Sequence, residues 1–117
     1  MTPLEWFSAA ARLAVWIEGQ GIVSEVRSVF VLRAEYFEDA LPRAVEHGRG
    51  LERSFSNGDG ERVRMKLIEI ETLDLLGDMI TDGREIYSES LDPAGDLPAG
   101  SEPSYDPVNS KPTQSGV

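Results

Sequence analysis

The chain has 117 residues, enough for one domain with a single hydrophobic core but not for separate cofactor and substrate domains. Its 21 Asp and Glu residues outnumber its 11 Lys and Arg residues, and the net charge of -10 argues against binding to nucleic acid or to anionic membranes. The chain has no cysteine, which excludes disulfides and thiolate-held metal centres and leads us to expect a cytoplasmic, reducing location.

The N-terminal third predicts a β-hairpin. The segment "MTPLEWFSAAARLAVW" carries Glu5 early and Arg12 within its apolar run, so we expect neither a secretory signal nor a membrane span. Odd positions from Phe7 to Ile17 are all apolar, and this period of two favours a strand with one buried face, although the alanines leave a helix as an alternative. The turn "GQG" and the Val-rich "IVSEVRSVFVLRA" then predict the second strand.

The next segment predicts one helix against a sheet. Its apolar residues recur at intervals of three and four, as in an amphipathic helix: Phe37, Ala40, Leu41, Ala44, Gly48, Leu51 and Phe55. Pro42 does not suit a helix interior, so we expect a helix start near Asp39 or a local kink.

After the turn "SNGDGE", a third strand is expected. Arg62, Arg64 and Lys66 alternate with apolar residues, and the phase changes at Leu67–Ile68, which predicts a β-bulge. The segment "TLDLLGDMITDG" fits either more strand or a helical turn, and "DGREIYSESL" predicts the last strand. The order β-β-α-β-β indicates an α+β domain over residues 1–91, with an antiparallel sheet packed on one long helix.

The last quarter of the chain differs in composition. Five of the seven prolines fall within residues 92–117, at Pro93, Pro98, Pro103, Pro107 and Pro112. Prolines at this spacing disfavour regular helix and internal strand. We therefore expect an extended or disordered tail rich in Pro, Gly and Ser.

Three sequence marks resemble those of a known family: Trp6–Phe7, the "SFSNGDGE" that follows the helix, and Asp82–Gly83 with Glu85, Tyr87 and Ser88. Residues 6–91 look like the small bacterial proteins grouped as domain of unknown function 4288. The chain departs from that pattern at Met65, where an aromatic residue is expected, and at Pro42. The resemblance implies the domain limits and a bacterial, cytosolic protein, and it assigns no catalytic residue.

Other candidates for chemistry are weak. His47 is the only histidine and lacks a cysteine nucleophile to activate, so it is interpreted as a boundary residue near a helix end. Asp74, Asp78 and Asp82 would share a helix face, but they do not reproduce a calcium-loop pattern and favour a solvated acidic loop. The glycine pairs match no phosphate-binding loop. We therefore expect no catalytic, metal or cofactor site.

The basic row Arg62, Arg64 and Lys66 is the most informative feature of the sequence, because alternate strand residues project from one face. Two interpretations remain open. Cross-strand salt bridges would pair the row with neighbouring acids, namely Glu18, Glu25, Glu85 or Glu89. Alternatively, the row and the aromatic residues Trp6 and Trp16 would form an interaction patch.

These observations favour a non-enzymatic, cytoplasmic protein-interaction module, such as an immunity or accessory factor that binds a basic partner with the help of its negative charge. One alternative is an anionic-ligand or hydrolytic site between helix and sheet, with the basic row holding an anion and Glu85 or Asp82 as base. Another is self-association through an edge strand, giving a homo-oligomer.

Overall fold

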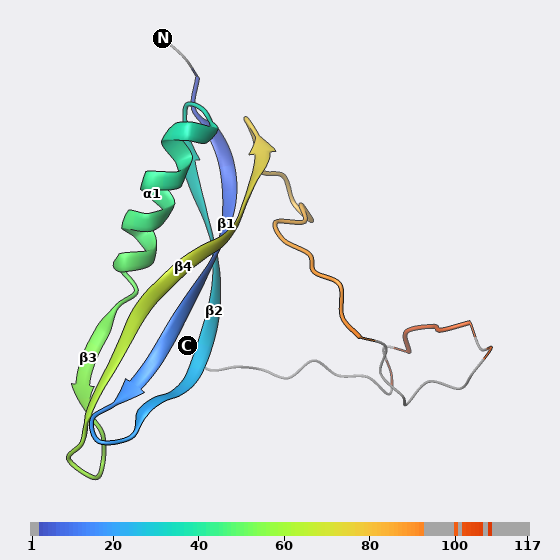
Figure 1. The fold of residues 1–117 in the computed structure, drawn as a ribbon. Coiled ribbons are helices and arrows are strands. Elements are labelled where there is room, and N and C mark those ends of the chain that lie inside the picture. Colours follow the sequence, from blue (N-terminus) through green and yellow to red (C-terminus); the bar gives the residue numbers. More distant parts are fainter. Residues whose placement is uncertain (1–2, 93–99, 101, 107, 109–117) are drawn as a thin grey trace.

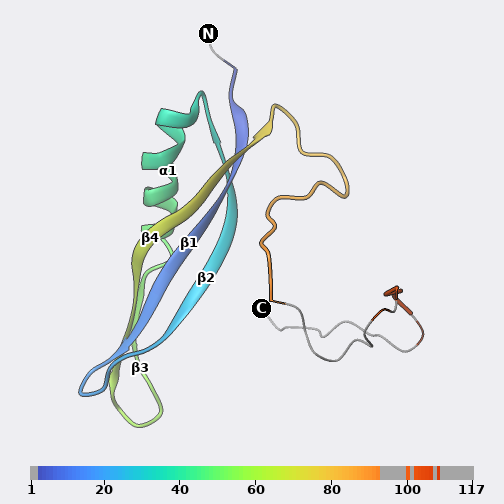
Figure 2. The ribbon, with the colours of Figure 1, turned by 45° about the vertical axis from the view of Figure 1, so that its right-hand side comes forward.

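The computed structural model describes residues 3–92, 100, 102–106 and 108. The chain forms β1 (Glu5–Ile17), β2 (Gly21–Ala34), α1 (Phe37–Arg49), β3 (Arg53–Ser56) and β4 (Arg62–Gly77). The strands make one antiparallel sheet in the order β2-β1-β4-β3. In Figures 1 and 2, α1 lies on one side of this twisted sheet and the segment after β4 lies on the other. The α+β class is confirmed. The predicted order β-β-α-β-β is only roughly matched, because β3 was not predicted and the strand expected after β4 is absent from residues 78–92.

The opening hairpin is also confirmed. β1 pairs with β2 from Glu5↔Ala34 to Ile17↔Gly21. The turn between the strands needs glycine, because Gly19 and Gly21 have φ values of 86° and 84°, which other residues rarely adopt.

Alternation along β1 defines the two faces of the sheet. The Phe7 ring meets the Phe37 ring of α1 edge-to-face at 6.5 Å, so the odd residues of β1 face the helix. At every register shift the skipped residue belongs to β2 or β4, so β1 itself is regular. Its even residues, from Trp6 to Trp16, therefore lie on the opposite side, which we call the far face.

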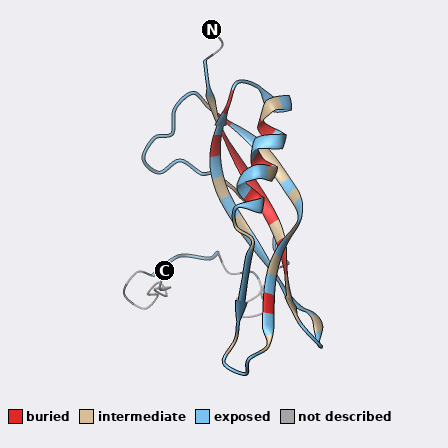
Figure 3. Cartoon of the chain, turned by 90° about the vertical axis from the view of Figure 1, so that its left-hand side faces the viewer, coloured by how far each residue is buried: buried red, intermediate tan, exposed pale blue. Residues whose placement is uncertain are grey.

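Small residues bring helix and sheet together. Ala9, Ala34, Ala40 and Ala44 are fully buried, and Figure 3 shows buried residues concentrated where α1 faces the sheet. A Cβ at Gly48 would lie 3.1 Å from a Leu67 methyl carbon, closer than an ordinary van der Waals contact. Glycine at this position therefore lets α1 approach β4.

The helix differs from the prediction at both ends. It starts at Phe37 rather than near Asp39, so Pro42 lies inside it. Pro42 has no N–H to donate to the carbonyl of Glu38, but Glu38 is exposed and water can satisfy that carbonyl. The helix ends at Arg49, and Phe55, expected to lie on its apolar stripe, belongs to β3 opposite Val63.

β4 is longer than expected. The bulge predicted near Leu67–Ile68 is confirmed, because Arg12 and Leu13 of β1 pair with Glu69 and Leu67 and skip Ile68. The ambiguous segment continues the strand to Gly77. The last strand predicted over "DGREIYSESL" is wrong, since residues 78–92 contain no strand. β4 already pairs with β1 from Trp6 to Ile17, so this later segment finds no strand partner there.

Within the described residues, no helix has the length and apolar character needed to cross a membrane. Most of the predicted tail, residues 92–117, lies outside the described part of the chain.

Candidate interaction surface

One end of the far face carries a stacked arginine. Trp16 of β1 stands directly opposite Arg64 of β4, and the guanidinium carbon of Arg64 lies 5.6 Å from the Trp16 ring centroid. This distance suits a cation–π contact. No carboxylate of the described residues is within ion-pair distance of Arg64. The Trp16 ring therefore orients this guanidinium while its N–H donors remain without an acidic partner.

Arg62 extends the same surface. Its Nη1 donates to the hydroxyl of Ser54 on β3 at 2.9 Å, and among the described residues it too has no carboxylate partner. Arg62 and Arg64 are exposed and point to the same face, two residues apart on one strand. We call Trp16, Arg62 and Arg64 the Trp16–Arg64 surface.

Lys66 differs from the two arginines. Its Nζ lies 3.9 Å from Oε1 of Glu52, and the other oxygen of Glu52 accepts a hydrogen bond from the backbone N–H of Leu67 at 3.0 Å. Glu52 was not among the partners expected for the basic row. None of the expected acids pairs with the row in the described structure: Glu18, Glu25, Glu85 and Glu89.

The structure separates the two tryptophans. Trp6 lies on the far face opposite Arg33, whose guanidinium carbon is 5.2 Å from the Trp6 ring centroid. Trp6 and Trp16 occupy opposite ends of β1, roughly 33 Å apart at about 3.3 Å per residue. The predicted patch is therefore divided, with Trp6 away from the basic row.

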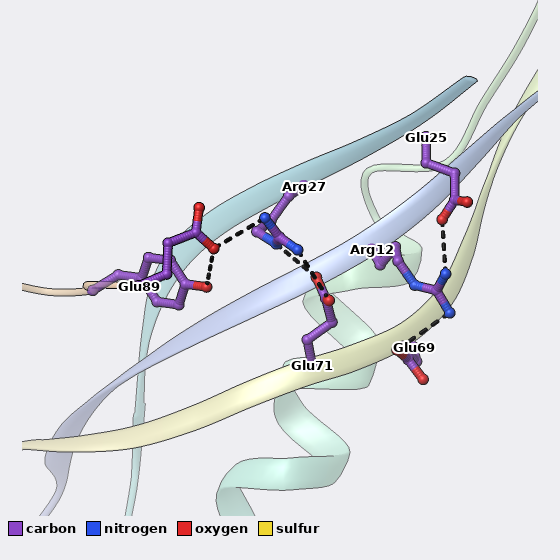
Figure 4. Close-up of polar contacts among 7 residues, drawn as sticks. Arg12, Glu25, Arg27, Glu69, Glu71 and Glu89 are labelled. Carbon is purple, nitrogen blue, oxygen red and sulfur yellow. Dashed lines mark hydrogen bonds and ion pairs between the residues drawn. The ribbon is translucent and has the colours of Figure 1, made fainter. Parts of the chain in front are cut away.

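Between these two ends lies an Arg–Glu network that the sequence did not reveal (Figure 4). Arg12 contacts Glu25 at 2.8 Å and Glu69 at 3.2 Å. Arg27 of β2 reaches over β1 to Glu71 of β4 with N–O distances of 2.8 and 3.2 Å. Arg27 also contacts Glu89 at 3.1 Å, which ties the segment after β4 to the far face.

Ionisation in the network follows these contacts. The hydrogen bond from Arg27 lowers the pKa of Glu71, and the same bond raises the pKa of Arg27. A hydrogen bond to Glu25 is the main cause that raises the pKa of Arg12. Desolvation raises the pKa of Tyr87, and its hydrogen bond to Glu89 adds to that effect. The carboxylates of the network therefore neutralise Arg12 and Arg27 in place.

The alternative hydrolytic site is not assembled. Glu85 lines a cavity of about 310 Å³ formed by residues 74–76 and 84–88. Asp82 also follows the end of β4 at Gly77. Arg64 lies near the other end of that strand, roughly 40 Å from Gly77 at about 3.3 Å per residue. The basic row and the two candidate bases do not converge.

The structure also places the remaining candidate residues, which are His47 and the three aspartates. The His47 ring in the last turn of α1 meets the Phe30 ring edge-to-face at 5.9 Å, at the rim of the core as expected. Asp74 is in β4 and Asp78 and Asp82 follow it, so the three aspartates do not share a helix face. Among the described residues, no group of His, Asp and Glu has an arrangement that could hold a metal ion.

No protein-family model, curated protein or solved structure matches the chain.

Proposed function

We propose that the protein is a non-enzymatic, cytoplasmic interaction module that binds an acidic segment of a partner protein on the Trp16–Arg64 surface. The observation that carries this proposal is Arg64, which is held over an aromatic ring and has no carboxylate partner in the described chain. By contrast, Arg12 and Arg27 on the same face are already paired with glutamates.

The chemistry of the surface suits a carboxylate. A guanidinium presents several N–H donors in one plane and can bind a carboxylate through two of them. Stacking on Trp16 restricts the orientation of Arg64, so less side-chain entropy is lost when a ligand binds. Tryptophan and arginine are also enriched among residues that dominate binding energy at protein interfaces.

The overall charge limits the kind of partner. A net charge of -10 opposes a uniformly acidic protein at long range. The proposed partner is therefore neutral or basic overall and presents a short acidic segment to Arg62 and Arg64. The partner's remaining positive charge would then favour encounter with the acidic domain.

A second candidate surface is acidic. Glu38 and Asp39 lie in the first turn of α1, Asp74 lies near the end of β4, and Asp78 follows that strand. These acids are at the same end of the domain, with α1 on one side of the sheet and Asp74 on the far face (Figure 1). The negative potential that these carboxylates produce at this end of the domain favours a cationic partner. An immunity or accessory factor that neutralises a basic enzyme would use this end.

Peptide binding separates the two candidates. We would titrate the full chain with a glutamate-rich and with a lysine-rich fluorescent peptide, at low and high salt. The proposal predicts binding of the glutamate-rich peptide that is lost in the double variant Arg62→Glu/Arg64→Glu. The matched control is Arg43→Glu/Arg49→Glu, which makes the same charge change at exposed positions of α1 and should retain binding. Preference for the lysine-rich peptide would instead support the acidic surface.

A further inference from the structure

The edge of the sheet formed by β2, at the other end of the strand order from β3, is unpaired in the described structure. β2 is the outer strand of the sheet and pairs only with β1 in the described structure. Three valines of β2 are exposed to solvent: Val26 by 39%, Val29 by 37% and Val31 by 37%. β-branched residues on a long edge strand promote pairing with another chain. β2 also lacks proline and lysine, which commonly protect such edges.

The regular part of β2 has a defined centre. The register with β1 skips Val23, which places a bulge there, and the pairing is continuous from Ser24 to Ala34. In an antiparallel pair of identical strands related by a two-fold axis, a residue on the axis meets itself. The register that pairs the whole bulge-free stretch with itself places Val29 on that axis.

The same register places opposite charges across from each other. It sets Glu25 opposite Arg33 of the second copy, and Arg33 opposite Glu25 of the second copy. Arg33 has no carboxylate partner in the described chain, and Glu25 uses only Oε1 to contact Arg12. Arg27 falls opposite Val31, and its side chain reaches across β1 to Glu71, away from the open edge (Figure 4).

The neighbouring registers are worse. Side chains directly opposite each other in an antiparallel pair share a face of the sheet. The two-fold axis must therefore pass through a residue, and each alternative register moves the axis by one residue. An axis at Val26 also pairs opposite charges, Glu25 with Arg27, but it reaches the bulge at Val23 after a few residues. Axes at Glu25, Arg27 or Phe30 bring like charges together, and an axis at Ser28 sets the charges opposite valines.

We propose that β2 pairs antiparallel with β2 of a second copy of this chain, with Val29 on the two-fold axis and Glu25 opposite Arg33 of the second copy. The two sheets would then form one continuous sheet. Odd-numbered residues of both β2 strands would share its far face, so the two Trp16–Arg64 surfaces would lie on the same side of the dimer. This dimer does not depend on the proposed function, because β2 contributes no residue to that surface.

The chain has no cysteine, so single substitutions give register-specific crosslinks. We would oxidise the Val29→Cys variant and the matched Val26→Cys variant, whose position is equally exposed on the same strand. Directly opposed residues have Cα atoms about 4.5–5.5 Å apart, within disulfide range. In the proposed register the two copies of Val26 are roughly 20 Å apart. Val29→Cys should therefore form a disulfide-linked dimer rapidly, and Val26→Cys should not.

Sedimentation of the full chain tests the dimer without a crosslink. The wild type should have twice the mass of one chain. Val29→Lys should sediment as a monomer because two ammonium groups meet at the axis, whereas Val26→Lys should remain a dimer. Circular dichroism checks that both variants fold. A monomeric wild type at every concentration, or crosslinking of Val26→Cys as fast as Val29→Cys, would overturn the proposal.

Discussion

Arg64 lies directly opposite Trp16 in the sheet, with its guanidinium carbon 5.6 Å from the ring centroid. Stacking and charge make separate contributions here, because lysine keeps the charge but has no planar group to stack or to bind a carboxylate through two donors. We expect Arg64→Lys to weaken binding of a glutamate-rich peptide severalfold and Arg64→Gln to weaken it about tenfold or more, since a hydrogen bond to a charged group contributes about 1.5–3 kcal/mol.

Fluorescence anisotropy of the labelled peptide measures both effects. Arg49→Gln is the control, because it removes one positive charge from the exposed end of α1. Equal affinity for Arg64→Lys and the wild type would show that only net charge matters and would contradict the stacked geometry as a determinant of binding.

The Arg27–Glu71 pair predicts a pH dependence of stability. The folded state lowers the pKa of Glu71 below its value in the unfolded chain, so its contribution is fully present above the ordinary glutamate pKa of about 4.3. That contribution is lost as the pH falls through the lower, folded-state pKa. Glu71→Gln should therefore be less stable than the wild type at neutral pH, and the difference should shrink in acid.

Urea unfolding at a pH of about 7 and of about 3 measures this difference in the free energy of unfolding. Glu46→Gln makes the same charge change at an exposed helix position and should show little difference at either pH. A stability gap for Glu71→Gln that is the same at both pH values would show that the ion pair does not cause it.

Ser8 predicts a stabilising substitution. Its side chain is fully buried on the far face, and its hydroxyl has no hydrogen-bond partner. An unsatisfied buried polar group costs about 1–3 kcal/mol, so Ser8→Ala should raise the free energy of unfolding by about 1 kcal/mol. Ser28→Ala, on the less buried edge strand β2, should change stability by less than about 0.5 kcal/mol. A destabilised Ser8→Ala protein would mean that the hydroxyl has a stabilising partner.

A larger side chain at Gly48 should destabilise the fold. A side chain there would press against Leu67 and Ile70 of β4, because a Cβ alone lies 3.1 Å from one and 3.5 Å from the other. Gly48→Val should lower the free energy of unfolding by about 1–3 kcal/mol through overpacking. Gly58→Val, where a Cβ meets open space, is the control. Equal stability of Gly48→Val and the wild type in thermal unfolding would contradict the close approach of α1.

The fold class was predictable because the apolar residues recur with a period of two along β1 and at intervals of three and four along α1. The bulge at Ile68 was also readable, since the change of phase in β4 is local. The end of the helix was not, because Leu51 and Phe55 continue its spacing by coincidence while the chain turns after Gly50. The segment "DGREIYSESL" would place Ile86 and Tyr87 on opposite faces of a strand. Whether it pairs depends on which sheet edges are free, and this cannot be deduced from the sequence.

The candidate surface was only partly predictable. Alternation placed Arg62 and Arg64 on one face. The register of β1 with β4 decides which tryptophan lies beside them, and it places Trp16 there and Trp6 at the other end of the strand. The Arg–Glu network was missed for the same reason, because Arg27 and Glu71 lie on strands that are not adjacent. Opposite charges near the middle of three long strands were the available signal.

Trp16 fluorescence reports whether an acidic peptide binds at the Trp16–Arg64 surface. The chain has two tryptophans, and Trp6→Phe leaves Trp16 as the only one. Titration of this variant with an unlabelled glutamate-rich peptide should change Trp16 emission saturably, with weaker binding at high salt, while a lysine-rich peptide should leave emission unchanged. Unchanged emission with the glutamate-rich peptide, in a protein shown to be folded, would contradict binding at the Trp16–Arg64 surface.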